Sequence, residues 1–334
     1  MSVVAAPPPP TGVDPVGEAL HRLRVTGVFY CRTEAAGPWA VEMPAFGDCL
    51  SFHVVTAGEC WVAVAGAPGV RLRAGDLALV PHGRGHLLAS EPGLTSLGRV
   101  DELPQELVTE NYSVLRHAGP GPRTELVCGV LAVDGPAARP LLELLPAVVH
   151  VPDAGPGSWI ASTLGLMASE VARPRPGGEA VTTRLADILV IQAIRVWLDG
   201  QEDAGGWLGA LRDPQIGAAV TAVHRAPEHG WTVAALAREA AMSRSAFAAR
   251  FTDVVGVPAM RYVQTWRMHV AADGLRQGQT VAHAAAAAGY ESVPAFSRAF
   301  KTATGRSPGA ARGERTQRKV PDAVGGSAPA GAAL

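Results

Sequence analysis

An internal duplication near the carboxyl end is the feature that most constrains how this 334-residue chain folds. Two segments carry the same residue types in the same order, displaced by 49 positions. The first copy contains Ser243, Phe247, Phe251 and Gly256, and the second contains Ser292, Phe296, Phe300 and Gly305. A repeat of this kind predicts two copies of one supersecondary unit.

Each copy predicts a short helix, a turn and a second helix. In the first copy we expect Thr232 to cap a helix over 233–240 and Ser243 to cap the next helix. Phe247 and Phe251 lie one turn apart in that second helix, so they face the same buried side. The second copy repeats this order with the equivalents Thr280, 281–288, Gly289, Ser292, Phe296 and Phe300. This is the helix-turn-helix pattern, found twice.

The segment that joins the two copies, residues 258–275, predicts one long helix. On such a connector two recognition helices would stand about one DNA turn apart, roughly 34 Å. Residues 214–319 hold fourteen basic and six acidic side chains, a net charge of +8, while the rest of the chain carries −9. An ordinary solvated basic surface gives the same asymmetry, so the charge supports nucleic-acid binding only together with the repeat.

Three stretches of this region, 231–251, 257–275 and 281–308, resemble the DNA-binding domain of AraC/XylS-type transcription regulators. The most specific similarity lies in Gly289-Tyr290-Glu291-Ser292, in 296–301 and in 305–308. The chain departs from the family at its end, where 309–312 replaces the usual Tyr-Arg after the proline. The resemblance implies a double-stranded DNA partner and a role in transcription.

The expected DNA contacts lie at the start of each second helix. Helix geometry turns residues beside the buried phenylalanines outward, and the family resemblance implies that most of these face bases. Arg298 can serve as a base reader or as a phosphate clamp, and Arg244, Arg250, Arg267 and Lys301 as phosphate neutralisers or solvated surface. The complete set of predicted DNA-binding residues is Arg244, Ser245, Ala248, Ala249, Arg250, Val293, Pro294, Ala295, Ser297, Arg298 and Lys301.

The amino-terminal part has a different pattern. Between Val25 and Val133 short apolar runs alternate with Gly, Pro and Asp turn signals, which is typical of a β-sandwich or barrel. Further on, 141–149, 159–171 and 182–198 have helical periodicity. The last of these is so apolar that it predicts either core packing or a dimer seam.

The predicted fold is therefore α+β: an amino-terminal β-barrel, a helical linker and an all-α double helix-turn-helix domain. The expected boundaries are 1–14 (disordered Pro-rich tail), 15–150 (sensor domain), 151–212 (helical linker or dimerisation segment), 213–315 (DNA-binding domain) and 316–334 (disordered tail).

A two-part spacing marks the β domain. Its first part runs from Gly47 through His53 and Glu59 to Gly66, and its second from Gly75 through Pro81-His82-Gly83 to His86. Together they resemble the two motifs of the cupin barrel, which implies a cupin-like sensor domain. The first motif lacks its second histidine, because Val55 stands in that place.

The cupin resemblance suggests a metal site. His53, Glu59 and His86 would form a two-His, one-carboxylate set, which suits Fe(II), Ni(II), Mn(II) or Zn(II). Cys60 and His82 could complete a softer site, although as neighbours of candidate ligands they should point the other way. We favour the alternative, in which the scaffold has lost its metal and leaves polar residues in a ligand cavity.

These residues predict a sequence-specific transcription regulator rather than an enzyme. It would respond to a small-molecule effector, or a metal, held in a pocket formed by Trp39, His53, Val55, Trp61 and His86. The main alternative is a metal-dependent cupin enzyme fused to a DNA-targeting module; an architectural DNA binder without an effector is a third class. A homodimer is the expected assembly.

Other features exclude several classes. The four cysteines include no CxxC pair and do not form a disulfide framework. No apolar run is long enough to span a bilayer, and the first residues have no leader-like pattern, so we expect a cytoplasmic protein without a membrane partner. The P-loop motif for nucleotide binding and the HExxH motif of zinc proteases are missing from the sequence.

Overall fold

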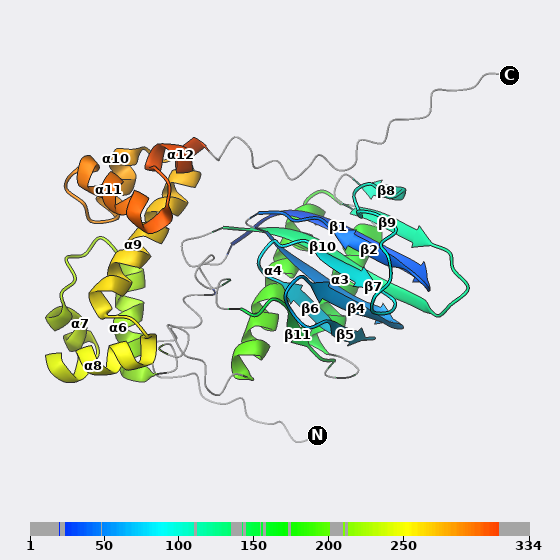
Figure 1. The fold of residues 1–334 in the computed structure, drawn as a ribbon, viewed down its shortest axis with the longest axis horizontal. Helices are drawn as coiled ribbons and strands as arrows, with labels where there is room; N and C mark the ends of the chain where they lie inside the picture. The colour runs from blue at the N-terminus through cyan, green and yellow to red at the C-terminus, as the bar shows by residue number, and fades with distance from the viewer. Residues whose placement is uncertain are drawn as a thin grey trace. The chain divides into compact units, whose positions relative to one another are not determined.

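The computed structural model describes residues 20, 24–47, 49–109, 112–134, 142, 145–153, 155, 158–172, 175–200, 210 and 213–313. The predicted tails 1–14 and 316–334, and the linker 201–212 except Ala210, lie outside the described residues. The chain divides into two compact units, and most of their described residues lie between 24 and 200 and between 213 and 313. Figure 1 shows the first unit built around β-strands and the second built from helices.

The first unit contains two β-sheets. The large sheet has the strand order β11 (Val149–Val151), β6 (Leu77–Val80), β3 (Cys49–Ala57), β10 (Arg123–Asp134), β1 (Arg24–Ala36), β9 (Tyr112–His117) and β8 (Gln105–Thr109). The small sheet has the order β2 (Ala40–Met43), β7 (His86–Ala89), β4 (Glu59–Val64) and β5 (Val70–Arg73). Neighbouring strands are antiparallel, apart from the parallel pair β1 and β9.

The core of this unit lies between the two sheets. Buried side chains of the large sheet, such as Val55 and Leu126, pack in one cluster with those of the small sheet, such as Val62 and Leu88. The expected closed barrel is wrong in one respect. In the described part of the chain the strand ladders form two separate sheets, and apolar side chains rather than a continuous ladder hold them together.

Two helices also belong to this unit. α3 (Trp159–Ala172) packs on α4 (Gly178–Asp199), and α4 contacts β1, β6 and β11. The hydroxyl of Tyr30 in β1 donates to the Thr182 carbonyl oxygen of α4 at 3.2 Å. Both helices, which the sequence placed in a separate linker, belong to the same compact unit as the two sheets, and α4 packs on the large sheet.

The predicted helix over 141–149 holds at Leu142 and is wrong from residue 145 onward. Residues 145–148 are irregular, and Val149 begins strand β11, which pairs with β6. Pro146 gives the physical reason, since a proline in a helix interior removes a hydrogen bond and clashes with the preceding turn.

The predicted core packing of α4 is confirmed for one of its faces, and the dimer seam stays a prediction. Leu185, Leu189 and Ala193 are buried as core residues. Ile188 and Val196 remain 45% and 38% exposed. Core packing therefore uses one face of this apolar helix and leaves a second apolar strip open.

The second unit is entirely helical in its described part. Its helices are α6 (Pro214–Arg225), α7 (Val233–Glu239), α8 (Arg244–Val255), α9 (Ala259–Arg276), α10 (Val281–Ala287), α11 (Val293–Thr304) and α12 (Pro308–Gly313). Figure 1 shows α9 running between α6–α8 at one end and α10–α12 at the other. The predicted connector and both predicted helix pairs are confirmed.

The predicted caps are confirmed as well. The Thr232 hydroxyl accepts from the Ala235 N–H at 3.1 Å, and the Ser243 hydroxyl accepts from the Ala246 N–H at 3.3 Å. The second copy makes the same contacts through Thr280 with His283 and Ser292 with Ala295, both at 3.2 Å. Each cap satisfies a backbone donor that the first helical turn leaves open.

The paired phenylalanines hold each copy together. The Phe247 and Phe251 rings lie 5.3 Å apart, and the Phe296 and Phe300 rings lie 5.4 Å apart with a similar tilt. All four side chains are buried. The two copies are therefore equivalent in packing as well as in sequence.

An ion pair fixes the first recognition helix to the helix before its motif. The Arg250 guanidinium in α8 donates from Nε at 2.8 Å and from Nη2 at 2.7 Å to Oδ2 of Asp213. The other Asp213 oxygen caps α6 by accepting from the Gln215 and Ile216 N–H groups. Burial alone would raise the pKa of Asp213, but the Ile216 N–H and the Arg250 guanidinium lower it overall.

The turns differ between the copies. Ala241, in the first turn, has a φ of 51°, while Gly289 occupies the equivalent place in the second with a φ of 73°. A left-handed conformation suits glycine and strains alanine. The first copy therefore carries a local strain that the second lacks.

We predict that Ala241→Gly stabilises the helical unit, because relief of the left-handed strain exceeds the added chain entropy. The expected gain is about 0.5–1 kcal/mol in the free energy of unfolding, measured by denaturant titration. Gly289→Ala is the matched reverse change and should cost about 1–2 kcal/mol. A loss of stability in Ala241→Gly would contradict the strain argument.

We also predict a pH-dependent contribution from Asp213. Asn can still cap α6, so Asp213→Asn removes chiefly the charge that faces Arg250, and should cost about 1 kcal/mol or less at pH 7. Because the native pKa lies below the unfolded value of about 3.9, the stabilisation is complete above that pH and disappears as pH falls through the native pKa. Chemical denaturation at pH 7, 5, 4 and 3 measures it. A wild-type to variant difference that stays constant down to pH 3 would exclude the mechanism.

Candidate nucleic-acid interface and ligand pocket

The two recognition helices, α8 and α11, present their amino-terminal turns to solvent. In α8 the predicted residues Arg244, Ser245, Ala248 and Ala249 are all exposed. Ala246, which the sequence did not single out, is exposed there too. The side chains that would enter a groove are therefore small, apart from Arg244.

α11 has the same arrangement with a longer basic edge. Val293, Pro294, Arg298 and Lys301 are exposed, whereas Ala295 and Ser297 are half-buried. Phe296 and Phe300 lie inward and fix which face turns out. The predicted orientation of both recognition helices is confirmed, and their contacts with DNA stay a prediction.

Two arginines expected at the DNA backbone are engaged inside the unit. Arg250 pairs with Asp213 as described above, and its side chain is about half exposed. Arg267 in α9 donates from Nε to the Pro227 carbonyl oxygen at 2.7 Å and from Nη2 to that of His229 at 2.8 Å. These side chains position helices, a role that the charge count could not distinguish from phosphate binding.

Arg267 also lies against the second helix-turn-helix unit. A side chain at Gly289 would place its Cβ only 3.1 Å from Nη2 of Arg267. The Arg267 guanidinium of α9 thus contacts both the turn of the second helix-turn-helix unit, at Gly289, and the segment that precedes the first unit. This contact restricts the orientation of α11 relative to α8.

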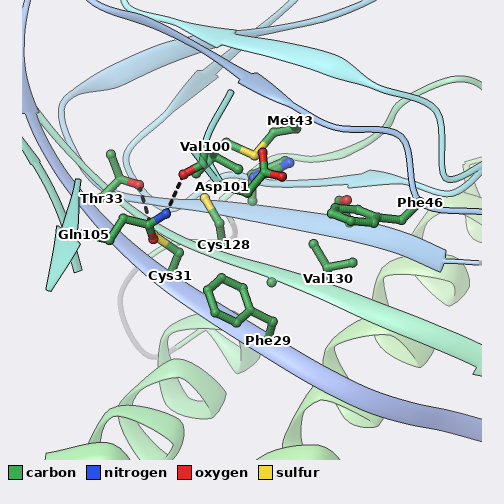
Figure 2. A pocket seen from close by; sticks show the side chains of 13 residues that line it. Phe29, Cys31, Thr33, Met43, Phe46, Val100, Asp101, Gln105, Cys128 and Val130 are labelled. Carbon is green, nitrogen blue, oxygen red and sulfur yellow. Dashed lines mark hydrogen bonds between the residues drawn. The ribbon is translucent and has the colours of Figure 1, made fainter. Parts of the chain in front are cut away.

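A pocket opens between the two sheets of the first unit. The empty space at this site amounts to about 790 Å³ when the part open to solvent is included. It is lined by Phe29, Cys31, Thr33, Met43, Phe46, Ser51, His53, Val100, Asp101, Gln105, Cys128, Gly129 and Val130. Figure 2 shows these side chains around the space.

Strand register explains why these residues meet. β1, β10 and β3 are neighbours, and Cys31, Cys128 and His53 are directly paired across them in one row. Phe29, Val130 and Ser51 form the next row on the same face. Since side chains alternate along a strand, both rows face the pocket and the intervening row faces away.

Most polar atoms in the pocket already have partners. Figure 2 shows Gln105 beside Cys31 and Val100. The Gln105 amide donates to the Val100 carbonyl and accepts from the Ser113 hydroxyl at 2.6 Å. Burial raises the pKa of the Cys31 and Cys128 thiols, which keeps them protonated and weak as nucleophiles.

Two buried histidines lie in contact at the inner wall. The Nε2 atoms of His53 in β3 and His86 in β7 are 2.7 Å apart. Nδ1 of His86 lies 3.2 Å from the Arg84 carbonyl oxygen, while Nδ1 of His53 has no partner. Burial lowers the pKa of both rings, for His86 to about 4, so both imidazoles are neutral at pH 7.

The predicted three-ligand metal site does not form. Glu59 is exposed at the start of β4 and binds Arg71 at 2.6 Å, away from the histidines. Within the described residues no group of three His, Cys, Asp or Glu side chains could hold a metal ion. The residues present do not fit the cupin metal, because alternation turns Glu59 outward and Val55 adds only a methyl surface.

The softer alternative ligands fail for related reasons. Cys60 is buried in the apolar core, on the opposite side of β4 from Glu59. His82 donates from Nε2 to the Leu145 carbonyl oxygen at 3.0 Å. Neither therefore completes a site with the histidine pair.

Of the residues predicted to form an effector pocket, only His53 lines this one. Trp39 and Val55 belong to the packed core, and Trp61 and His86 do not line the space. The lining residues of β1 and β10 were missed, since their approach to β3 depends on pairing between segments far apart in sequence. The available signal was the two-residue spacing of Ser51 and His53, which places both on one face of a strand.

Comparison with known proteins is consistent with this geometry. The family model for the cupin domain matches residues 14–199, and that for the helix-turn-helix domain matches 236–314. An AraC-like transcription regulator of Streptomyces antibioticus is 33% identical, covering 89% of this chain and 97% of that protein. The HTH-type transcriptional regulator AlkR of Acinetobacter baylyi is 29% identical, covering 84% and 92%.

Among solved structures, the DNA-binding domain of AdpA in complex with a target DNA is 28% identical, with a TM-score of 0.29. The match covers 30% of this chain and 92% of that one. None of the helices in the described part of the chain combines the length and apolarity that crossing a membrane requires. The chain belongs to the AraC family of transcription regulators, with an amino-terminal cupin domain and a carboxyl-terminal helix-turn-helix DNA-binding domain.

Proposed function

We propose that this regulator adjusts its DNA binding to a small-molecule effector held between the two sheets of the cupin domain. The observation that carries the proposal is the pocket, which is concave, largely apolar and open to solvent. A metal-dependent enzyme has less support, since its predicted carboxylate ligand is paired with Arg71. Thermal shift with three small aromatic probes, naphthalene, 2-naphthol and 2-naphthoate, tests the effector site, because a ligand that binds the folded protein raises its melting temperature.

The DNA part of the proposal concerns α8 and α11. Their exposed turns offer mainly small side chains, which suit close approach to bases and contact with thymine methyl groups. Ser245 and Arg298 supply polar groups for direct readout of base edges. Lys301 and Arg244 flank them and suit phosphate contacts.

We predict that Arg298→Ala weakens binding to a selected operator by roughly 1–3 kcal/mol if Arg298 reads a base. Fluorescence anisotropy on the operator and on variants at each base position measures this, at a fixed salt concentration. Arg73→Ala, which changes an exposed arginine of the cupin domain, is the charge-matched control and should leave affinity unchanged. An equal loss on every sequence would assign Arg298 to a phosphate instead.

We further propose that the protein is a homodimer joined along the exposed strip of α4. Val181, Ile188 and Val196 recur at intervals of seven and eight residues on the face turned away from the sheet. Exposed Arg184 and Arg195, three turns apart, lie along one edge of this strip. A second copy of the same helix, packed antiparallel, would bury the strip and keep both arginines in water.

We predict that Ile188→Glu weakens self-association at least about tenfold, because it places a charge in the proposed seam. Sedimentation velocity over a micromolar concentration series measures the change. Leu97→Glu is the matched control, since Leu97 is 46% exposed elsewhere on the same unit. A wild-type protein that stays monomeric, or equal behaviour of the two variants, would remove α4 from the interface.

A further inference from the structure

We infer that the effector is an uncharged, largely apolar molecule with one hydroxyl group, an alcohol or a phenol, which donates a hydrogen bond to Nδ1 of His53. This inference rests on the proposed function, since it names the chemistry of the molecule that the pocket takes. It follows from what the lining offers, which of its polar atoms already have partners, and which proton each imidazole carries.

The pocket lining favours a ligand with a largely apolar surface. Two aromatic rings, a thioether and two valines make up much of the wall: Phe29, Phe46, Met43, Val100 and Val130. Figure 2 shows Phe29, Phe46 and Val130 facing the space. A ligand gains affinity here by removing this surface from water, and the flexible thioether of Met43 adapts to ring edges.

Two polar side chains of the lining, Gln105 and Asp101, are already fully engaged. Both functional ends of Gln105 are engaged, by Val100 and by Ser113. Asp101 is held by Arg99, which donates from Nε to Oδ1 at 3.1 Å and from Nη2 to Oδ2 at 2.7 Å. The Arg99 guanidinium lowers the pKa of Asp101 and offsets its charge. Neither Gln105 nor Asp101 therefore needs a hydrogen-bond partner from a ligand.

Among the described lining residues, His53 carries a buried polar atom that has no partner. Its side chain is only 1% exposed, it lines the pocket, and its Nδ1 has no hydrogen-bond partner. A buried polar atom left in this state destabilises the free protein, and a ligand that supplies a partner recovers that free energy. Nδ1 of His53 is therefore a buried atom of a lining residue with an unused hydrogen-bonding position.

The hydrogen bonds of the histidine pair define what that atom needs. The Arg84 carbonyl can only accept, so the neutral His86 ring carries its proton on Nδ1 and leaves Nε2 as an acceptor. His53 must then donate from Nε2 across the 2.7 Å contact. With its proton on Nε2, His53 presents a bare acceptor at Nδ1. The missing partner is a donor.

Charge in the ligand is disfavoured in either sign. A carboxylate would bring a second acceptor to Nδ1, near an ionised Asp101, and no Lys or Arg lines the pocket in the described part of the chain. An ammonium would lose its hydration while Asp101 is already paired with Arg99. A neutral hydroxyl supplies the donor without either cost.

Three probes of one shape test this in the full-length protein: naphthalene, 2-naphthol and 2-naphthoate. Titration calorimetry and thermal shift should rank 2-naphthol at least about fivefold tighter than naphthalene, the difference that one recovered buried hydrogen bond gives. 2-Naphthoate should bind most weakly. Tighter binding of naphthoate would overturn the hydroxyl assignment and leave the effector pocket intact, while failure of all three to bind would overturn both.

Variants of His53 test whether its Nδ1 atom causes the preference for 2-naphthol. His53→Phe removes the acceptor and should abolish the preference for 2-naphthol while keeping the affinity for naphthalene. His53→Asn places an amide oxygen near the position of Nδ1 and should restore the preference, which a role in folding alone would not. His117→Phe in β9 is the matched control outside the pocket. A preference that survives in His53→Phe, or is not restored in His53→Asn, would overturn the inference.

Discussion

Pairing of three central strands is the constraint on which the cupin domain depends. β1, β10 and β3 are in a register that places Cys31, Cys128 and His53 in one row toward the pocket. The next row, Tyr30, Gly129 and Phe52, faces the other way, and Tyr30 bonds to α4 on that side. Gly129 is required there, because a Cβ would overlap the Phe52 ring. A slip of one residue would exchange pocket and helix-bearing face.

The DNA-binding unit depends instead on local rules applied twice. Hydroxyl caps begin the helices, paired phenylalanines close them, and the two copies share α9. The copies differ where only one needs glycine: Gly289 leaves room for Arg267, while exposed Ala241 accepts strain in the equivalent turn. Duplication therefore preserved the packing of each copy, and the contacts between copies set the differences.

The sequence predicted features within one segment well, and contacts between segments far apart in the chain poorly. Caps, buried phenylalanines and outward faces follow from spacing within ten or so residues, and the structure confirms them. The metal set failed because motif spacing fixes position along a strand but Glu59 turns outward at the start of β4. The pocket lining was missed for a related reason: Cys31, His53 and Cys128 become neighbours only through strand register. Arg250 and Arg267 counted as basic surface until their partners Asp213, Pro227 and His229 were known.

The large sheet also determines which element an effector in the pocket would influence first. A ligand bound at His53 lies against the inner face of β1, β10 and β3, and a single layer of backbone separates that face from Tyr30 and Phe52. α4 packs directly on β1, so a shift in that strand acts on α4 with no intervening element. Coupling requires that the ligand bind two arrangements of this layer unequally. Because the other face of α4 carries the exposed strip of Ile188 and Val196, self-association is the property on which such a difference would act most directly.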